Sequence, residues 1–174
     1  MTIKTQADDT LTLELTKQHL YVDFDDDDVL ISNQIIASLQ AVEHYLNLQV
    51  LDTTYENTVA ELTPFEDDVL KLTLPYKPFN ITVTDSSGST TYTEREEHYY
   101  YDNADGYLYV PQTDLGITAI EAVCGGVNTQ SIDQARLLLV GNFYAFREND
   151  VNTTINKLPT GATFLLDSLE GAVL

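Results

Sequence analysis

The densest group of residues that could do chemistry is the acidic run Asp23–Asp28, DFDDDD. Its alternating carboxylates are spaced like the first ligands of an EF-hand calcium loop. The pattern then fails, because Asp28 takes the place of the loop glycine and Gln34 that of the bidentate glutamate. The competing interpretation is that four residues start a helix, where carboxylates cap free amides and match the helix dipole. These four are Asp25, Asp26, Asp27 and Asp28.

Two further sites could carry chemistry, and each has a simpler interpretation. Glu94, Glu96 and His98 would share one face of a strand and could hold a metal ion, although a solvated sheet edge explains them as well. Cys124 stands among apolar residues and glycines, which is typical of an inert core thiol. Nucleophile-elbow, phosphate-loop and zinc-protease motifs are missing from the sequence. We therefore predict no catalytic centre, no metal site and no cofactor.

Charge is the unusual feature of the composition. The 174 residues include 28 acidic and 8 basic side chains, a formal net charge of −20. Binding to DNA or to an anionic membrane needs clustered Lys and Arg, so this balance argues against both. No apolar run approaches the roughly 18 residues of a membrane span. The lone Cys124 cannot form an internal disulfide, which fits folding in a reducing cytoplasm.

The element around which the chain is organised is a predicted helix, Ser131–Glu148. Ser131 is a good N-cap, and apolar residues then recur at helical spacing. This predicted core face consists of Ile132, Ala135, Leu139, Phe143 and Phe146. Most of the other side is apolar too, and solvent is expected only at Gln134, Arg136 and Asn142. A helix apolar nearly all round is covered by several partners, so we predict that it lies at the centre of the fold.

Two helices are predicted over residues 12–47. Thr12 can cap a short helix over Leu13–Leu20, and a long helix follows the acidic run and ends near Asn47. Its apolar stripe is expected at Val29, Ile35, Ile36, Leu39, Val42 and Leu46. The polar lead Met1–Thr10 is expected to be loose.

Between the helices, residues 51–126 change from helical to strand periodicity. Val69–Leu74 alternates as a strand, Ile81–Thr84 is another, and Gly106 marks a hairpin turn. Ile117–Cys124 is the last predicted strand. We expect a small antiparallel sheet inserted within one domain, because the flanking helices need each other to bury their apolar faces.

The C-terminal stretch 149–174 combines a polar linker with a short apolar segment. Six residues could dock onto a partner: Leu158, Pro159, Phe164, Leu165, Leu166 and Leu169. A short apolar segment that follows a polar linker often binds a partner protein. The alternative is that the segment folds back on its own subunit.

The order of these parts resembles the head–tail connector (adaptor) proteins of tailed bacteriophages. The resemblance lies in Leu11–Leu46, in Leu74–Pro75 and Pro78–Phe79 ahead of a strand, and most strongly in Ile132–Glu148. Leu158–Pro159 and Leu165–Leu166 complete it, whereas Leu169-Glu170-Gly171 stands where the family often has a basic residue after the Leu pair.

Together, the pattern and the resemblance predict an α+β fold. It would have three main helices, an inserted antiparallel sheet, a connector domain over 1–148 and an extended C-terminal docking arm over 149–174. The resemblance implies a structural virion protein, made in the host cytoplasm, that forms a ring of about twelve copies. The ring would join the portal protein to neck or tail proteins and let genomic DNA pass without specific binding. A small calcium- or metal-dependent binding module or enzyme, working through residues 23–28 or 94–98, is the alternative.

Overall fold

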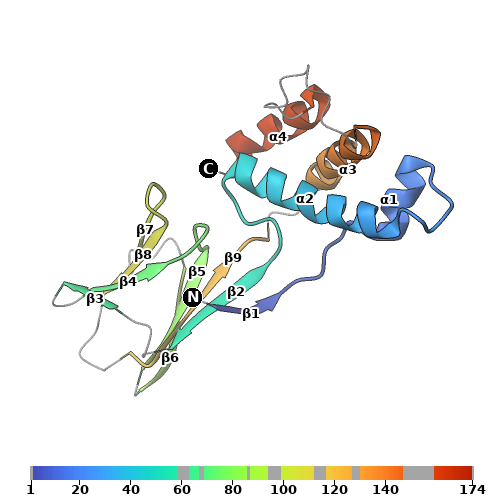
Figure 1. Ribbon diagram of the computed structural model, residues 1–174. Helices are drawn as coiled ribbons and strands as arrows, with labels where there is room; N and C mark the ends of the chain where they lie inside the picture. Colours follow the sequence, from blue (N-terminus) through green and yellow to red (C-terminus); the bar gives the residue numbers. More distant parts are fainter. Residues whose placement is uncertain are drawn as a thin grey trace. The chain divides into compact units, whose positions relative to one another are not determined.

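The protein has two compact units, which we name the sheet unit and the helical unit. The sheet unit comprises Met1–Asp8 and Leu51–Gly126, and the helical unit comprises Asp9–Val50 and Val127–Leu174. The computed structural model describes residues 2–58, 63–66, 69–85, 87–93, 99–111, 117–126, 130–146 and 159–173. In this part of the chain there are four helices and nine strands, so the α+β prediction is confirmed (Figure 1).

The sheet unit holds two antiparallel sheets instead of the single sheet expected. One has the order β1 (Thr2–Gln6), β2 (Thr53–Thr58), β9 (Ala119–Cys124), β5 (Asn80–Asp85) and β6 (Gly88–Thr93). The other has the order β3 (Thr63–Glu66), β4 (Val69–Thr73), β8 (Tyr107–Pro111) and β7 (Tyr100–Asp102). Every pair of neighbouring strands is antiparallel.

The core of the sheet unit follows from the period of two that the sequence shows. Leu70 and Leu72 of β4 turn inward while Lys71 between them turns outward, as alternation requires. Inward residues from both sheets form one cluster: Tyr55, Leu70, Leu72, Leu74, Ile81, Val83, Leu108, Val110, Ile117, Ile120, Ala122 and Cys124. Antiparallel sheets with one buried face are stabilised in this way.

The N-terminal lead is ordered, which corrects the expectation of a loose segment. Thr2–Gln6 forms edge strand β1 and pairs with β2, from Thr2 opposite Glu56 to Gln6 opposite Thr53. The Lys4 ammonium pairs with the carboxylates of Glu56 and Glu121. The sequence pattern missed this strand because all five side chains are exposed, so no apolar face marks it.

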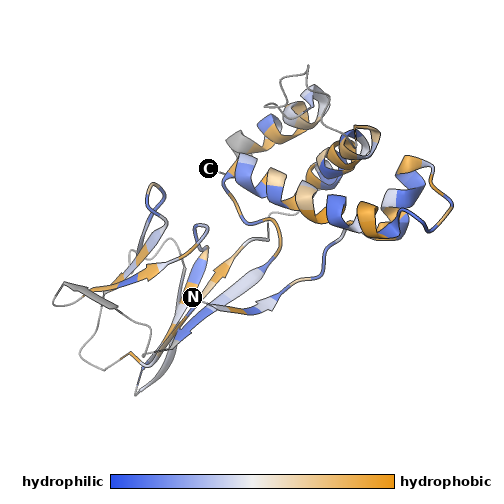
Figure 2. Ribbon diagram, viewed as in Figure 1, coloured by the Kyte–Doolittle hydropathy of each residue, from blue (hydrophilic) through white to orange (hydrophobic). Residues whose placement is uncertain are grey.

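The helical unit contains α1 (Leu13–Leu20), α2 (Asp28–Leu46), α3 (Gln130–Ala145) and α4 (Thr160–Val173). Helix α3 packs against the other three helices, so the predicted central helix is confirmed (Figure 1). Hydrophobic residues cover most of its length (Figure 2). None of the helices in the described residues is long and apolar enough to cross a membrane.

The predicted core face of α3 is correct at its beginning and wrong at its end. Ile132, Ala135 and Leu139 are buried, whereas Phe143 is half-buried and Phe146 is 67% exposed. The helix ends at Ala145, so Phe146 lies beyond its last turn instead of on its core face. Residues 147 and 148 lie outside the described part of the chain.

The face that α2 buries is rotated from the predicted one. Ile31, Ile35, Ser38 and Val42 are buried at helical spacing. Two residues of the predicted stripe, Val29 and Ile36, point instead to solvent, with exposed fractions of 76% and 55%.

The C-terminal segment is a helix, which corrects the expectation of an extended arm. Ala162 and Leu166 of α4 are buried where α4 packs on α3. Phe164 is 75% exposed. Helix α4 thus packs on its own subunit, and docking onto a partner stays a prediction.

Candidate functional site

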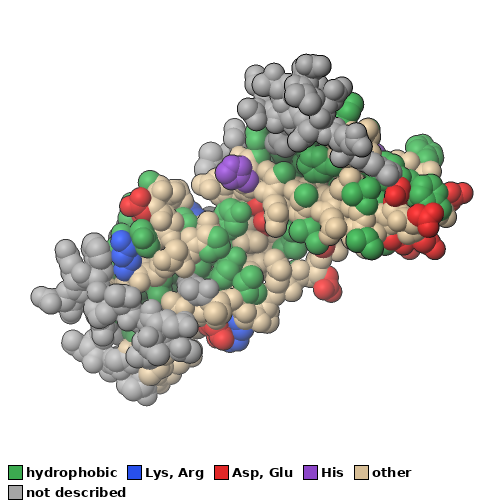
Figure 3. All heavy atoms as spheres, in the orientation of Figure 1, with side chains coloured by type: hydrophobic (Ala, Val, Ile, Leu, Met, Phe, Trp, Pro, Cys, Tyr) green, Lys and Arg blue, Asp and Glu red, His purple; other side chains and the backbone are tan. Residues whose placement is uncertain are grey.

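Three carboxylates of the acidic turn each contact a side chain of α1 or α3. The Lys17 ammonium lies 2.8 Å from Asp25 and 2.6 Å from Asp28, and the Tyr144 hydroxyl donates to Asp27 at 2.6 Å. The hydrogen bond from Lys17 lowers the pKa of Asp25 below its ordinary value. Figure 3 shows acidic side chains gathered at the end of the helical unit where α1 meets α2. The turn is thus an acidic surface tied to α1 and α3.

This geometry gives the calcium interpretation no support. Among the described residues, no three His, Cys, Asp or Glu side chains are placed to share a metal ion. Asp27 is the N-cap of α2 but makes no side-chain capping hydrogen bond, so the predicted capping role is wrong for this residue. Asp28 lies in the first turn of α2, where the helix dipole favours its charge. The second metal candidate, Glu94 to His98, falls outside the described residues.

Cys124 is a core thiol, as predicted. It is fully buried, and its Sγ lies 3.4 Å from the carbonyl oxygen of Tyr76. Burial raises its pKa to about 12. Because the thiolate is the nucleophile, a thiol with this pKa is unreactive at neutral pH.

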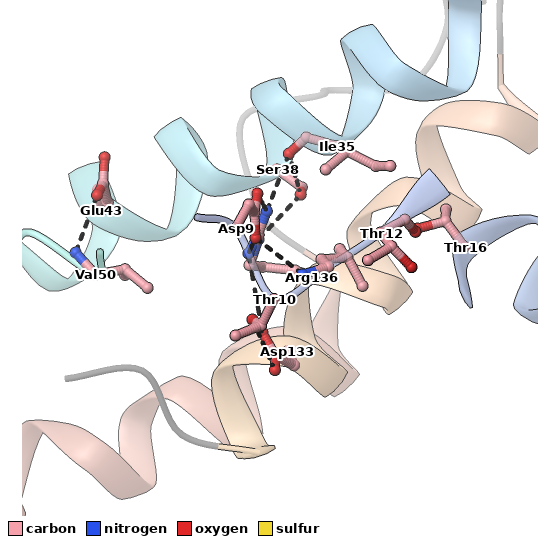
Figure 4. Close-up of polar contacts among 11 residues, drawn as sticks. Asp9, Thr10, Thr12, Thr16, Ile35, Ser38, Glu43, Val50, Asp133 and Arg136 are labelled. Carbon is pink, nitrogen blue, oxygen red and sulfur yellow. Dashed lines mark hydrogen bonds and ion pairs between the residues drawn. The ribbon is translucent and has the colours of Figure 1, made fainter. Parts of the chain in front are cut away.

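Arg136 is the main site residue that the sequence analysis placed wrongly. The side chain was predicted to lie in solvent, but its exposed fraction is 0%. Figure 4 shows the residues that it contacts. Its two terminal nitrogens donate to the two carboxylate oxygens of Asp9 at 2.7 and 2.6 Å. Further contacts at 3.4 Å reach the Ser38 hydroxyl and the Ile35 carbonyl. This fork connects α3 to α2 and to the segment that leads into α1.

The surroundings of Asp9 favour the charged form of its carboxylate. Burial by itself disfavours its charge, but hydrogen bonds from Arg136 and from the Leu11 amide outweigh burial and lower its pKa. Next to it, the Thr10 hydroxyl donates to Asp133 at 2.9 Å. Asp133 also lies 3.8 Å from Arg136 (Figure 4). The cluster is therefore a structural tie, since the buried guanidinium already donates to Asp9, Ser38 and Ile35.

A second buried ionisable side chain, Glu43, lies near the C-terminal end of α2. One oxygen of Glu43 accepts from the Val50 amide and from the Gln49 side chain, each at 2.9 Å. One feature of the sequence could have marked Arg136, since it is the single Lys or Arg in a largely apolar helix. No sequence signal identifies the partner of Arg136, because Asp9 is 127 residues away.

The predicted docking residues do not all lie on one surface. Leu166 faces the interior, Phe164 faces solvent, and Leu165, Leu169 and Pro159 are half-buried. Leu158 lies outside the described residues.

Comparison with protein families identifies the chain. The family model of the Phage gp6-like head-tail connector protein matches residues 10–107. This range is more than half of the 174 residues, and the chain belongs to that family of structural phage connectors.

Three solved structures resemble the chain over 97% of its length and 94% of theirs. They are the virion of a native gene transfer agent (GTA) particle (16% identity, TM-score 0.49), the neck of an empty GTA particle computed with C6 symmetry (14%, 0.48) and the neck of a native GTA particle computed with C12 symmetry (16%, 0.48). Comparison with curated proteins gave no match. The family assignment rests on the family match alone.

Proposed function

We propose that this connector protein forms a closed ring that joins the portal to the neck or tail and forms part of the DNA channel. The observation that carries the proposal is the family match over residues 10–107. Such a role is structural and needs no catalytic centre or cofactor. The α3-centred core supports it, because ring subunits must keep their shape while they bind several neighbours.

DNA would pass through this ring without being held. Net charge is −20 per chain, and about twelve copies would repel phosphates near the channel wall. Three cations are already engaged within the chain: Lys4 and Lys17 with carboxylates, and Arg136 with Asp9. Lys71 lies 3.6 Å above the ring of Tyr107. These contacts leave the four cations named here poorly placed for the row of phosphate contacts that DNA binding needs.

The C-terminal segment remains our candidate for portal docking. Phe164 is the residue best suited to insert into a partner, since it is large, apolar and exposed on a helix anchored by Leu166. Leu158, Pro159, Leu165 and Leu169 would extend this contact, while Leu166 would hold α4 in place. Helix-in-groove docking uses exposed apolar anchors such as Phe164.

Two measurements on the full chain test the ring. Native mass spectrometry over a concentration series should show one closed assembly, and electron microscopy should show a ring with an axial hole. A chain that stays a single subunit at all concentrations, and also in the presence of its phage portal, would refute the ring. Duplex DNA should not bind even at low salt, and tight salt-sensitive binding would contradict free passage.

The docking surface is tested with a matched pair of variants. Phe164→Asp should abolish sedimentation with portal-bearing heads, whereas Phe146→Asp, which adds the same charge on another exposed aromatic residue, should not. Equal retention of both variants would show that the portal binds elsewhere.

A further inference from the structure

We infer that the solvent side of α2 is a contact surface for a second copy of this chain. The surface, named the α2 strip, consists of Val29, Asn33, Ile36, Ala37 and Gln40. This inference rests on the proposed ring and assigns it a surface.

The strip is one continuous face of the helix. Val29, Asn33, Ile36 and Gln40 follow one another at steps of three or four, and Ala37 lies beside Ile36 and four residues after Asn33, which places all five on one side of α2. The opposite side, with Ile31, Ile35, Ser38 and Val42, is buried in the helical unit. The strip is therefore an exposed face with two large aliphatic side chains, Val29 and Ile36, and it has no partner within the described part of the chain.

The strip is also free of charge in a strongly charged protein. Charged residues make up 21% of the chain, yet none occurs between Val29 and Val42. At the strip, apolar side chains alternate with the amides Asn33 and Gln40, which can hydrogen-bond without adding charge. Interface centres are depleted in charged residues in the same way.

The same charge distribution identifies the partner. Two copies at −20 each repel one another, and contacts between their acidic surfaces would require cations to compensate. Lys17 and Arg136, the cations of the described helical unit, are already bound to its own carboxylates. A basic partner would gain most at the acidic turn Asp23–Asp28. An equally acidic partner, such as another copy, is best accommodated on an uncharged strip.

The size of the strip fits a ring better than an isolated dimer. From Val29 to Gln40 it extends about 16 Å, at about 1.5 Å per residue. A stable pairwise interface buries roughly 800 Å² on each partner, more than five side chains supply. In a closed ring each copy makes two contacts through two different surfaces, and closure adds to their strength. We infer that the strip forms one half of this contact.

The test adds one negative charge to the strip of the full chain. Ile36→Glu should weaken assembly at least about tenfold in native mass spectrometry, since it buries an unpaired charge against an acidic neighbour. Phe146→Glu adds the same charge to an exposed residue outside the strip and should assemble as the unmodified chain does. Circular dichroism checks that both variants remain helical.

A second measurement does not depend on how Ile36→Glu folds. A photo-crosslinking amino acid at Asn33 should yield covalent dimers of the chain, and the same group at Phe146 should not. If rings form but Ile36→Glu assembles normally, or Asn33 yields no dimer, the strip assignment is wrong and the ring stands. If Ile36→Glu and Phe146→Glu both prevent assembly to the same extent, the strip assignment is also wrong, because a negative charge at any exposed position would then be enough to prevent assembly. If the unmodified chain never assembles, the proposed ring fails, and the strip with it.

Discussion

The interiors of the two units differ in the kind of polar residue that they bury: among the described residues, the sheet unit buries the uncharged Thr53 and Asn57, whereas the helical unit also buries an arginine and a glutamate. The core cluster of the sheet unit consists of aliphatic residues with Tyr55 and Cys124. The helical unit buries Arg136, Glu43, Ser38 and Thr16 among its apolar residues. Each of these four has hydrogen-bond partners within the helical unit.

This difference separates two ways of holding a fold together. Hydrophobic burial in the sheet unit is roughly proportional to area and has no direction. A buried bidentate pair is satisfied in only one arrangement, so Arg136 specifies how the segment at Asp9 joins α2 and α3. Such a pair contributes specificity more than net stability, and breaking one half of it is expensive.

The largest effect is expected from removing the arginine. Arg136→Met should lower the free energy of unfolding by at most about 3–5 kcal/mol, the range for a fully buried pair, because the Asp9 carboxylate loses its partner but keeps some contact with solvent. Urea unfolding at neutral pH measures this. Lys4→Met, which removes an exposed cation, is the control and should leave the unfolding midpoint almost unchanged.

The double variant Arg136→Met with Asp9→Leu separates pair breakage from loss of packing. An apolar replacement of a buried pair is often close to neutral, so the second change should restore much of the lost stability. A double variant as unstable as the sum of both single variants would mean that the two side chains act independently.

Aliphatic truncations should affect both units about equally. Leu139→Ala in α3 and Leu108→Ala in β8 each remove a fully buried side chain and should cost roughly 2–5 kcal/mol. Thermal and urea unfolding measure both. Phe146→Ala, at an exposed residue, should change stability by less than about 0.5 kcal/mol. A large loss for Phe146→Ala together with no loss for Leu139→Ala would show that α3 is oriented differently.

What the sequence predicted well is what periodicity alone determines. Helices α1, α2 and α3, strands such as β4 and β9, and the α+β class follow from local spacing of apolar residues. The orientation of α2 did not follow, because Val29, Ile31, Ile35 and Ile36 offer two overlapping apolar stripes. Only the packed partners decide between them.

The tertiary polar contacts could not be predicted at all. Arg136 looks like a solvated residue until Asp9 is brought to it. Strand β1 has no inward side chain and exists through its ladder with β2. Helix α4 was not predicted, because a short apolar segment after a polar linker is as compatible with an extended docking arm as with a helix. In each case the deciding partner is distant in sequence.

The charge of Asp9 makes part of the stability of the helical unit depend on pH. Hydrogen bonds from Arg136 hold its folded-state pKa below the unfolded value of about 3.9, despite opposing burial. This stabilisation is complete above the unfolded pKa and is lost as the pH falls through the folded pKa. Urea unfolding at pH 7 should show Asp9→Asn as less stable than the unmodified chain, and the gap should shrink below pH 4. A gap that stays constant down to pH 2 would show that folding does not change the pKa of Asp9.

The smallest effect is expected at the start of α1, where one hydrogen bond caps the helix. The Thr12 hydroxyl accepts from the Leu15 amide at 3.2 Å, whereas Asp27 at the start of α2 makes no such bond. Thr12→Ala should therefore cost about 1 kcal/mol, the usual value of a lost cap. Thr12→Ser keeps the hydroxyl and is the control, and it should stay within about 0.5 kcal/mol. Differential urea unfolding resolves the two variants. If Thr12→Ser loses as much as Thr12→Ala, the methyl group of Thr12 and not its cap stabilises α1.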